Sequence, residues 1–252
     1  MTADDLVAAL DLPAATRVDQ RVPKKLFLEN GAPTAADRRA ITDGVEECRW
    51  VAALKPHTIG VPDYRDADRE YVEIHVLRLT AAPDAKTTRL TELVHRAVPY
   101  PLLLVHEHGN TLALSAAHKR HSLGEAGKTV LEAPPVAVDV NSPTFARFQG
   151  DFAAAILLAK QPQASLYALY SGWLDTLVAL LAAGRTGQFR FCDTRDAAEA
   201  RRQALETCTA ADAEVARIRA AAARETQVAR QAELNQALRA VRAKLSAAEA
   251  DL

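Results

Sequence analysis

The chain has 252 residues and 49% of them are apolar, enough for one large domain or for a compact domain with an appendage. Its 31 Lys and Arg residues nearly balance 32 Asp and Glu residues, which excludes a strongly basic or strongly acidic protein. Three widely spaced cysteines, Cys48, Cys192 and Cys208, match neither a secreted disulfide framework nor a CxxC zinc site.

The sequence predicts a soluble protein of the cytoplasm. The amino-terminal segment MTADDLVAALDL lacks the basic start and the uninterrupted apolar run of a signal peptide. The most apolar later stretch, 173–183, contains Asp175 and is about half as long as the ~20 residues that a membrane span requires. We therefore expect no contact with a membrane.

The first third of the chain is expected to contain a lead-in and one helix. Prolines and other turn-forming residues interrupt residues 1–33, which predicts an irregular segment. Thr34 then caps a helix with Asp37 three residues later, and Pro56 ends it. Ile41, Val45 and Cys48 would form the buried side of this helix.

A small mixed sheet is expected next, in the order strand, helix, strand, strand. The alternation in 71–80 predicts a strand, 87–97 a helix, and the apolar run 101–107 a buried strand. Gly109 supplies the turn into a further strand, LALSAA. A crossover of about twenty residues allows the first two strands to be parallel. The segment TVLEAPPVAVDV is at most an edge strand, because its two prolines donate no ladder hydrogen bonds.

Two helices should cover this sheet and complete a head domain of residues 34–190. Ser142 and Pro143 form a helix start, and phenylalanines at 145, 148 and 152 mark its buried side. A second helix is expected over 166–183, with Gly184 as its end. The predicted fold class is therefore α+β, followed by a long helical arm.

The arm, residues 193–252, is expected to be one coiled-coil-type helix that Asp193 and Asp196 cap. No Gly or Pro follows Gly187, and such a helix would be on the order of 80 Å long. Apolar residues at heptad spacing form a seam: Leu234, Leu238, Val241, Leu245 and Leu252. Apolar residues at 205–222 form a second run at heptad spacing, but the repeat does not continue in register through 223–233 into the seam. We therefore expect a stutter or bend there. The seam must be covered by the chain's own domain, by a second copy or by another protein.

Local positive charge marks candidate contacts for nucleic acid or for a partner. Residues 217–244 contain seven basic and two acidic side chains; they either meet phosphate or form a solvated face that suits the helix dipole. The run 118–121 is either a phosphate-binding corner or the polar exit from a hairpin. The candidate contact residues are Lys24, Lys25, Lys119, Arg120, Arg217, Arg224, Arg239 and Arg242.

No catalytic residue can be assigned from motifs. The sequence lacks phosphate-cradling loops, a nucleophile elbow and CxxC pairs, and the seven histidines between 57 and 121 have no metal-site spacing. We expect no metal and no cofactor. Carboxylates at Glu70, Glu73 and Glu107 leave a metal-dependent nuclease open, although no lysine stands two residues after any of them.

Several segments, in order, resemble a bacterial family of domains of unknown function. They are VPKKLFLENG, CRWVAALKPHTIGVP, EYVEIHVLRL, HRAVPYPLLLV, SAAHKR and RETQVARQAELNQALRAVRAKL, and HRAVPYPLLLV with AHKR is the most specific part. Members of that family are encoded beside superfamily-2 helicases and DNA methyltransferases in restriction-modification-like or phage-defence gene clusters. The resemblance implies a context of DNA processing and assigns no catalytic residue.

These observations favour a non-catalytic accessory subunit whose helical arm docks on a helicase or methyltransferase partner or on a second copy, with possible contact to nucleic acid. The alternatives are a metal-dependent nuclease with an unrecognised motif and a purely structural homodimer.

Overall fold

The computed structural model describes residues 1–125 and 127–252, and the chain divides into two compact units, Met1–Leu177 and Val178–Leu252. The first unit is built on a six-stranded mixed sheet with the order β1-β2-β5-β6-β7-β10. These strands are β1 (Arg17–Arg21), β2 (Val45–Leu54), β5 (Ile74–Ala81), β6 (Leu102–His108), β7 (Thr111–Ala116) and β10 (Val136–Asp139). The mixed α+β fold class is confirmed.

The predicted core of the sheet is also confirmed. β5 and β6 are parallel, and α5 (Thr87–Ala97) forms the crossover between them. β6 and β7 form an antiparallel hairpin in which Gly109 has a φ of 56°. β10 lies at the edge of the sheet beside β7.

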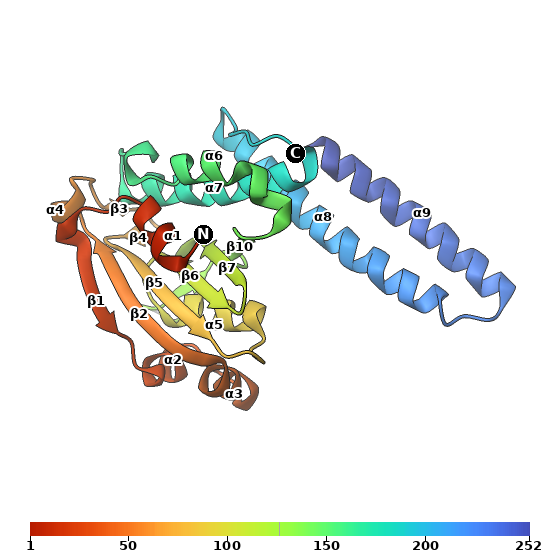
Figure 1. Cartoon of the computed structure of the whole chain (residues 1–252), viewed down its shortest axis with the longest axis horizontal. Coiled ribbons are helices and arrows are strands. Elements are labelled where there is room, and N and C mark those ends of the chain that lie inside the picture. The colour runs from red at the N-terminus through yellow and green to blue at the C-terminus, as the bar shows by residue number, and fades with distance from the viewer. Residues whose placement is uncertain (126) are drawn as a thin grey trace. The chain divides into compact units, whose positions relative to one another are not determined.

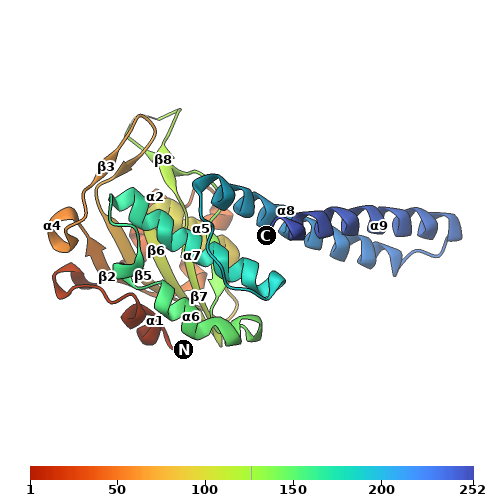
Figure 2. The same ribbon diagram turned by 90° about the horizontal axis from the view of Figure 1, so that it is seen from above.

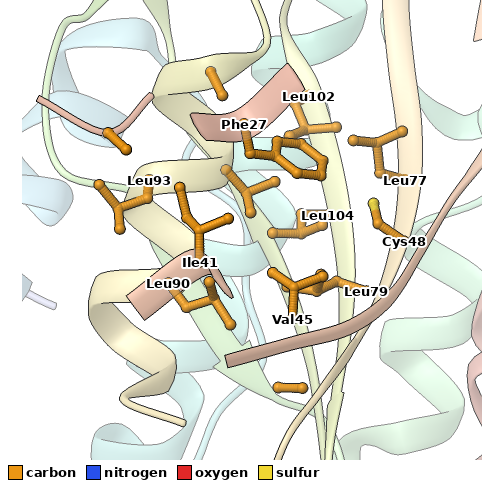
Figure 3. Close-up of a cluster of buried hydrophobic side chains, with 14 residues drawn as sticks. Phe27, Ile41, Val45, Cys48, Leu77, Leu79, Leu90, Leu93, Leu102 and Leu104 are labelled. Carbon is orange, nitrogen blue, oxygen red and sulfur yellow. The ribbon is translucent and has the colours of Figure 1, made fainter. Parts of the chain in front are cut away.

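Helices cover both faces of the sheet (Figures 1 and 2). On one face, α5, α2 (Lys24–Asn30) and α3 (Ala35–Gly44) enclose a cluster that includes Leu77 and Leu79 of β5 and Leu102 and Leu104 of β6 (Figure 3). Successive strand residues point to opposite faces, so Leu103 and Val105 are buried on the other side, where α1 (Ala3–Ala9) contacts β6.

The second covering layer includes α6 (Gln149–Ala155), which follows a 3₁₀ turn at Pro143–Phe148, and the first half of α7 (Leu166–Thr186). As expected, Phe145, Phe148 and Phe152 are buried. The Tyr170 hydroxyl donates to the carbonyl oxygens of Leu102 and Ala117, at 2.8 and 3.1 Å, and so joins α7 to the sheet.

Shorter elements connect these layers. They are the 3₁₀ turns Ala14–Thr16 and Leu158–Lys160, α4 (Pro56–Ile59), and two small ribbons, β3 (Tyr64–Arg65) with β4 (Glu70–Tyr71) and β8 (Lys119–His121) with β9 (Thr129–Leu131). Among the described residues, α7 alone has the length and apolar composition of a membrane span, but 67% of that window is buried, as in the core helix of a soluble protein.

Two predictions about the first third of the chain are wrong. Residues 1–33 are not irregular, because they form α1, β1 and α2, and their prolines and glycine stand at element ends: Pro23 precedes α2 and Gly31 follows it. The helix that Thr34 caps ends at Gly44, and β2 replaces its expected second half. Register shifts lie between Val45 and Glu47 and between Trp50 and Ala52. A bulge adds one residue to the strand. Buried residues on the two sides of the bulge therefore lie three positions apart, as on one face of a helix, instead of two.

In the second unit, the arm is two helices and not one: α8 (Arg195–Ala222) and α9 (Val228–Ala250), which pack together (Figure 1). The chain turns within the segment where a stutter or bend was expected. Thr194, rather than either aspartate, caps α8 by accepting from the Ala197 amide at 3.2 Å. The end of α7 also differs from its prediction. The helix continues past Gly184 and ends before Gly187, which has a φ of 77°. Arg185 of α7 pairs with Asp212 of α8 and, at 3.0 Å, with Glu249 of α9.

The heptad seam of α9 faces α8. Leu234, Leu238, Val241, Leu245 and Leu252 are all half-buried, Ala248 between them is buried, and their neighbours along α9 are exposed. On α8, Leu205, Cys208 and Ile218 are buried in return. The seam residues therefore pack on α8, the first part of the arm itself, an arrangement that was not among the three covers that the sequence left open.

Replacing both Leu238 and Leu245 by Asp should destabilise the α8–α9 hairpin by several kcal/mol, because each change places an unpaired charge in the half-buried contact with α8. Hydrogen exchange should show lost amide protection in α8 and α9 and retained protection in β5 and β6. The matched control replaces the exposed Gln236 and Ala243 by Asp on the same helix. Unchanged protection in the seam variant would contradict the packing of α9 on α8.

Gly31→Ala should destabilise the first unit by about 1–3 kcal/mol, because the added methyl would stand 2.6 Å from the Leu93 carbonyl oxygen and 2.8 Å from the Ala97 Cβ. Gly150→Ala is the control, since nothing lies within 4 Å of its added methyl. Thermal unfolding should show a lower melting temperature for Gly31→Ala alone. Equal melting temperatures for the two variants would contradict the close approach of α2 to α5.

Candidate functional site

The hairpin of α8 and α9 presents exposed positive charge. Arg224, Arg239 and Arg242 are all exposed, and no ion pair of theirs is found in the described part of the chain. Arg217 is also exposed but pairs with Glu214 at 2.6 Å, so one of its contacts is already made. Three of the four arginines predicted on the arm therefore have guanidinium groups available to an external ligand.

The positive charge lies on both helices of the hairpin and on the segment that connects them. Because α8 and α9 run in opposite directions on either side of the short segment 223–227, Arg217, Arg219, Arg224 and Arg230 lie near this connection, whereas Arg239, Arg242 and Lys244 lie in the second half of α9. Residues 217–244 carry seven basic and two acidic side chains, an excess of five positive charges. We name this region, residues 217–244, the basic half of the hairpin.

The four predicted contact residues of the first unit do not form one surface with each other. The Lys24 ammonium donates to the Thr42 carbonyl oxygen at 2.8 Å, and Lys25 pairs with Glu29 at 3.6 Å on the surface of α2. Arg120 is half-buried and donates to the His121 carbonyl oxygen at 3.1 Å. These are local contacts, and they leave the exposed Lys25 as the most accessible of these charges.

Lys119 does not lie on a phosphate-binding surface, which corrects its assignment from the sequence. Its side chain is buried, and the ammonium donates to the carbonyl oxygens of His95 and Val98 at the end of α5. A cation at this position satisfies carbonyls that the helix leaves unpaired and interacts favourably with the helix dipole. Burial lowers the pKa of the Lys119 ammonium to about 7. Its role in the structure is to cap α5.

A serine and a histidine that no sequence motif singled out meet between β4 and α7. His118 Nδ1 lies 2.7 Å from the Tyr71 hydroxyl, and Nε2 lies 3.4 Å from the Ser171 hydroxyl. The Tyr71 oxygen also accepts from the Lys119 amide at 3.3 Å. In one tautomer of His118, Nδ1 accepts the Tyr71 proton and Nε2 carries the ring hydrogen.

This tautomer makes His118 a hydrogen-bond donor to Ser171, whose hydroxyl in turn donates to the Tyr167 carbonyl oxygen at 2.8 Å. A general base would need its unprotonated nitrogen toward the serine. The arrangement is a chain of hydrogen bonds that joins α7 to the end of the sheet.

A polar cluster at the start of β5 was also missed by sequence reasoning. The Glu73 carboxylate lies 3.2 Å from the Lys55 ammonium and 3.5 Å from His75 Nε2. The His75 ring is held between Trp50 and Tyr100, with ring centroids 4.6 and 4.7 Å away. Burial lowers the pKa of His75, so the imidazole is neutral at pH 7. Lys55 is distant in sequence, which explains why a search for a lysine two residues after Glu73 could not find the pair.

The other acidic and histidine candidates have internal partners. Glu107 pairs with Arg78 at 2.7 Å. His95 Nε2 lies 2.9 Å from the Ser115 hydroxyl and His106 Nδ1 lies 3.2 Å from that of Thr91, both between α5 and the sheet. Burial lowers the pKa of His106 to about 4 and that of His95 to about 3. Within residues 1–125 and 127–252, no group of three or more His, Cys, Asp or Glu side chains could hold a metal ion.

A pocket of about 450 Å³ lies where β1 ends beside β2. Its lining mixes basic, acidic and apolar groups: Arg21, Val22, Pro23, Lys24, Val45, Glu46, Glu47 and Cys48. Burial raises the pKa of the Cys48 thiol to about 12, so the thiol is not a nucleophile at neutral pH. The pocket contains Lys24 but brings together no acid, base and nucleophile in a catalytic arrangement.

The comparison with protein families gives one match. The model described as "Domain of unknown function (DUF4391)" matches residues 10–245, which include both compact units nearly in full. No curated protein and no solved structure matches the chain.

The buried Lys119 should make stability depend on pH. Its pKa is about 7 in the folded chain and 10.5 when exposed, so between these values the unfolded state binds more protons and stability rises with pH. The free energy of unfolding should increase by at most about 1.4 kcal/mol per pH unit between pH 7 and 9. Lys119→Met should lack this increment, as denaturant titrations at several pH values would show. Parallel pH profiles of the two proteins would contradict the lowered pKa.

Proposed function

The chain belongs to the DUF4391 family of domains of unknown function, and from that premise we propose that it is a non-catalytic accessory subunit of a DNA-processing system in bacterial phage defence. Its partner in this proposal is a helicase or a DNA methyltransferase, in keeping with the gene clusters in which the resembling family is encoded. The cytoplasm, where these enzymes meet DNA, is the proposed location. The subunit contacts nucleic acid through the basic half of its hairpin.

The observation that carries the proposal is the exposure of Arg224, Arg239 and Arg242 without ion pairs among the described residues. Exposed arginines on a helix offer guanidinium groups that suit phosphate oxygens. The whole chain has a net charge of −1, so binding depends on this local excess and not on a global field.

The seam supports a hairpin that acts as one unit. Since α9 turns its apolar residues toward α8, the outer faces of both helices are left to polar and small side chains. Such a surface suits contacts with charged ligands or with a polar partner surface better than insertion into an apolar groove. A homodimer through the arm would have to use these outer faces or reopen the hairpin.

The head supports an accessory role rather than a catalytic one. Polar side chains of the head are engaged in the fold: Lys119 caps α5, and the His118 imidazole lies between the hydroxyl groups of Tyr71 and Ser171. The Lys55–Glu73 pair is the arrangement that would favour the metal-dependent nuclease. Incubation of the full chain with plasmid and Mg²⁺ or Mn²⁺ distinguishes the two, since cleavage would overturn the accessory assignment.

Charge reversal of Arg217, Arg224, Arg239 and Arg242 to Glu should abolish retention of nucleic acid by the full chain at low ionic strength, because it replaces attraction to phosphate by repulsion. Arg217 should contribute least, since Glu214 already pairs with it. An electrophoretic shift assay measures the loss, and a pull-down with helicase and methyltransferase subunits tests the partner.

The matched control for this charge reversal is replacement of the four arginines by Lys, which keeps the positive charge and should therefore retain nucleic acid at low ionic strength. Circular dichroism should report the same helix content for all three proteins. If the natural chain retains no DNA or RNA even at the lowest salt, the hairpin does not contact nucleic acid.

A further inference from the structure

The hairpin carries no aromatic residue. The last aromatic side chain in the chain is Phe191, which precedes α8, and residues 192–252 contain no Phe, Trp or Tyr. Val228, the most exposed large apolar side chain of the hairpin at 80%, is aliphatic and lies at the start of α9. Proteins that hold single strands combine positive charge with aromatic rings on which bases stack, each worth about 1–3 kcal/mol. The hairpin offers the charge without the rings.

The positive charge is displayed on a rigid, extended scaffold. The portion of α9 in the basic half, residues 228–244, is about 25 Å long. A duplex of that length carries roughly 15 phosphates, at one per ~1.7 Å, and holds them in fixed positions. A single strand has about half this charge density and must be ordered before it can follow a straight surface.

Basic residues of both helices can contact phosphates. Basic residues lie on both partners, Arg217 and Arg219 on α8 and Arg239, Arg242 and Lys244 on α9. The axes of packed helices lie about 8–10 Å apart. This spacing is between the widths of the minor and major grooves of B-form DNA, about 6 and 12 Å. Because arginine side chains are long and flexible, those at the end of α8 and those in the second half of α9 can reach phosphates at separate places along a duplex.

We infer that the ligand of the basic half is the phosphate backbone of a double-stranded nucleic acid, bound without base recognition, and not a single strand. This inference rests on the proposed function, because it names the ligand of that same surface. The recognition chemistry is guanidinium to phosphate, which DNA and RNA duplexes share. Comparing a DNA duplex with an RNA duplex identifies which of the two is preferred.

Fluorescence anisotropy with the full chain tests the inference. The probes are a mixed-sequence DNA duplex of about 20 base pairs, an RNA duplex of the same sequence, and each single strand alone, over a series of salt concentrations. We expect at least one duplex to bind roughly tenfold more tightly than its single strands. For three to five phosphate contacts, the slope of log affinity against log salt should be about −2.7 to −4.5.

Three variants locate the contact. Arg224→Gln, Arg239→Gln and Arg242→Gln combined should reduce the magnitude of the duplex slope by about 2.7, the share of three phosphates. The matched control, Arg38→Gln, Arg39→Gln and Lys86→Gln, removes the same charge from exposed positions of the first unit and should leave the slope unchanged. Replacing the three hairpin arginines by Lys should preserve the slope, because the slope depends on the number of phosphates that positive charges neutralise.

The possible failures are distinguishable. Single strands that bind as tightly as both duplexes would overturn this inference and leave the proposed nucleic-acid contact standing. No binding of any probe at the lowest salt would overturn both. An equal loss of slope in the control variant would show that the contact does not lie on the hairpin.

Discussion

The parallel pairing of β5 with β6 is the constraint on which the first unit depends. A parallel pair requires a crossover, and α5 supplies it by passing over one face of the sheet. α5 buries Leu90, Leu93 and Val94 against Leu77, Leu79 and the strands beside them, and α2 and α3 pack around it. The crossover ends inside the protein, so its last carbonyl groups need a partner. Lys119 provides one, because the chain returns from β7 to the end of α5.

The same end of the sheet explains why the most specific sequence segments of the family resemblance belong together. The segment that ends α5 and begins β6 contains His95, and the segment that leaves β7 contains His118 and Lys119. The Lys119 ammonium bonds to the first segment, while its amide bonds to Tyr71. The Tyr71 hydroxyl group is hydrogen-bonded to the His118 ring, and the other nitrogen of that ring is hydrogen-bonded to Ser171 of α7. Residues that suggested a basic corner are therefore joined by buried hydrogen bonds, each of which is costly to leave unmade.

Periodicity predicted the elements that are regular and failed where the backbone departs from regularity. The alternation in 74–81 and the helical spacing in 87–97 are undisturbed, so β5 and α5 were identified from sequence. In β2, bulges separate the buried Val45 and Cys48 by three residues, and a strand acquired the spacing of a helix. The sequence also could not predict which polar groups are buried. The ammonium of Lys119 and the Lys55–Glu73 pair depend on contacts between segments 18 to 24 residues apart, which no local pattern encodes.

The hairpin shows how a correct local pattern can lead to a wrong larger unit. The 4-3 spacing from Leu234 onward predicted the buried side of α9, and the phase break at 223–233 located the turn. The sequence does not reveal whether a break in phase bends a helix or reverses the chain. Reversal changes which charged residues lie side by side. Acidic residues early and basic residues late in one straight helix would suit its own dipole, as in a solvated face. In two helices of opposite direction, the basic second half of α9 lies beside the more acidic first half of α8, and Arg217 and Arg219 lie at the end of α8 near the connection. Basic residues late in each helix still suit the dipole of that helix, and contact of the outward-facing arginines with an anionic ligand is the role that we propose for them.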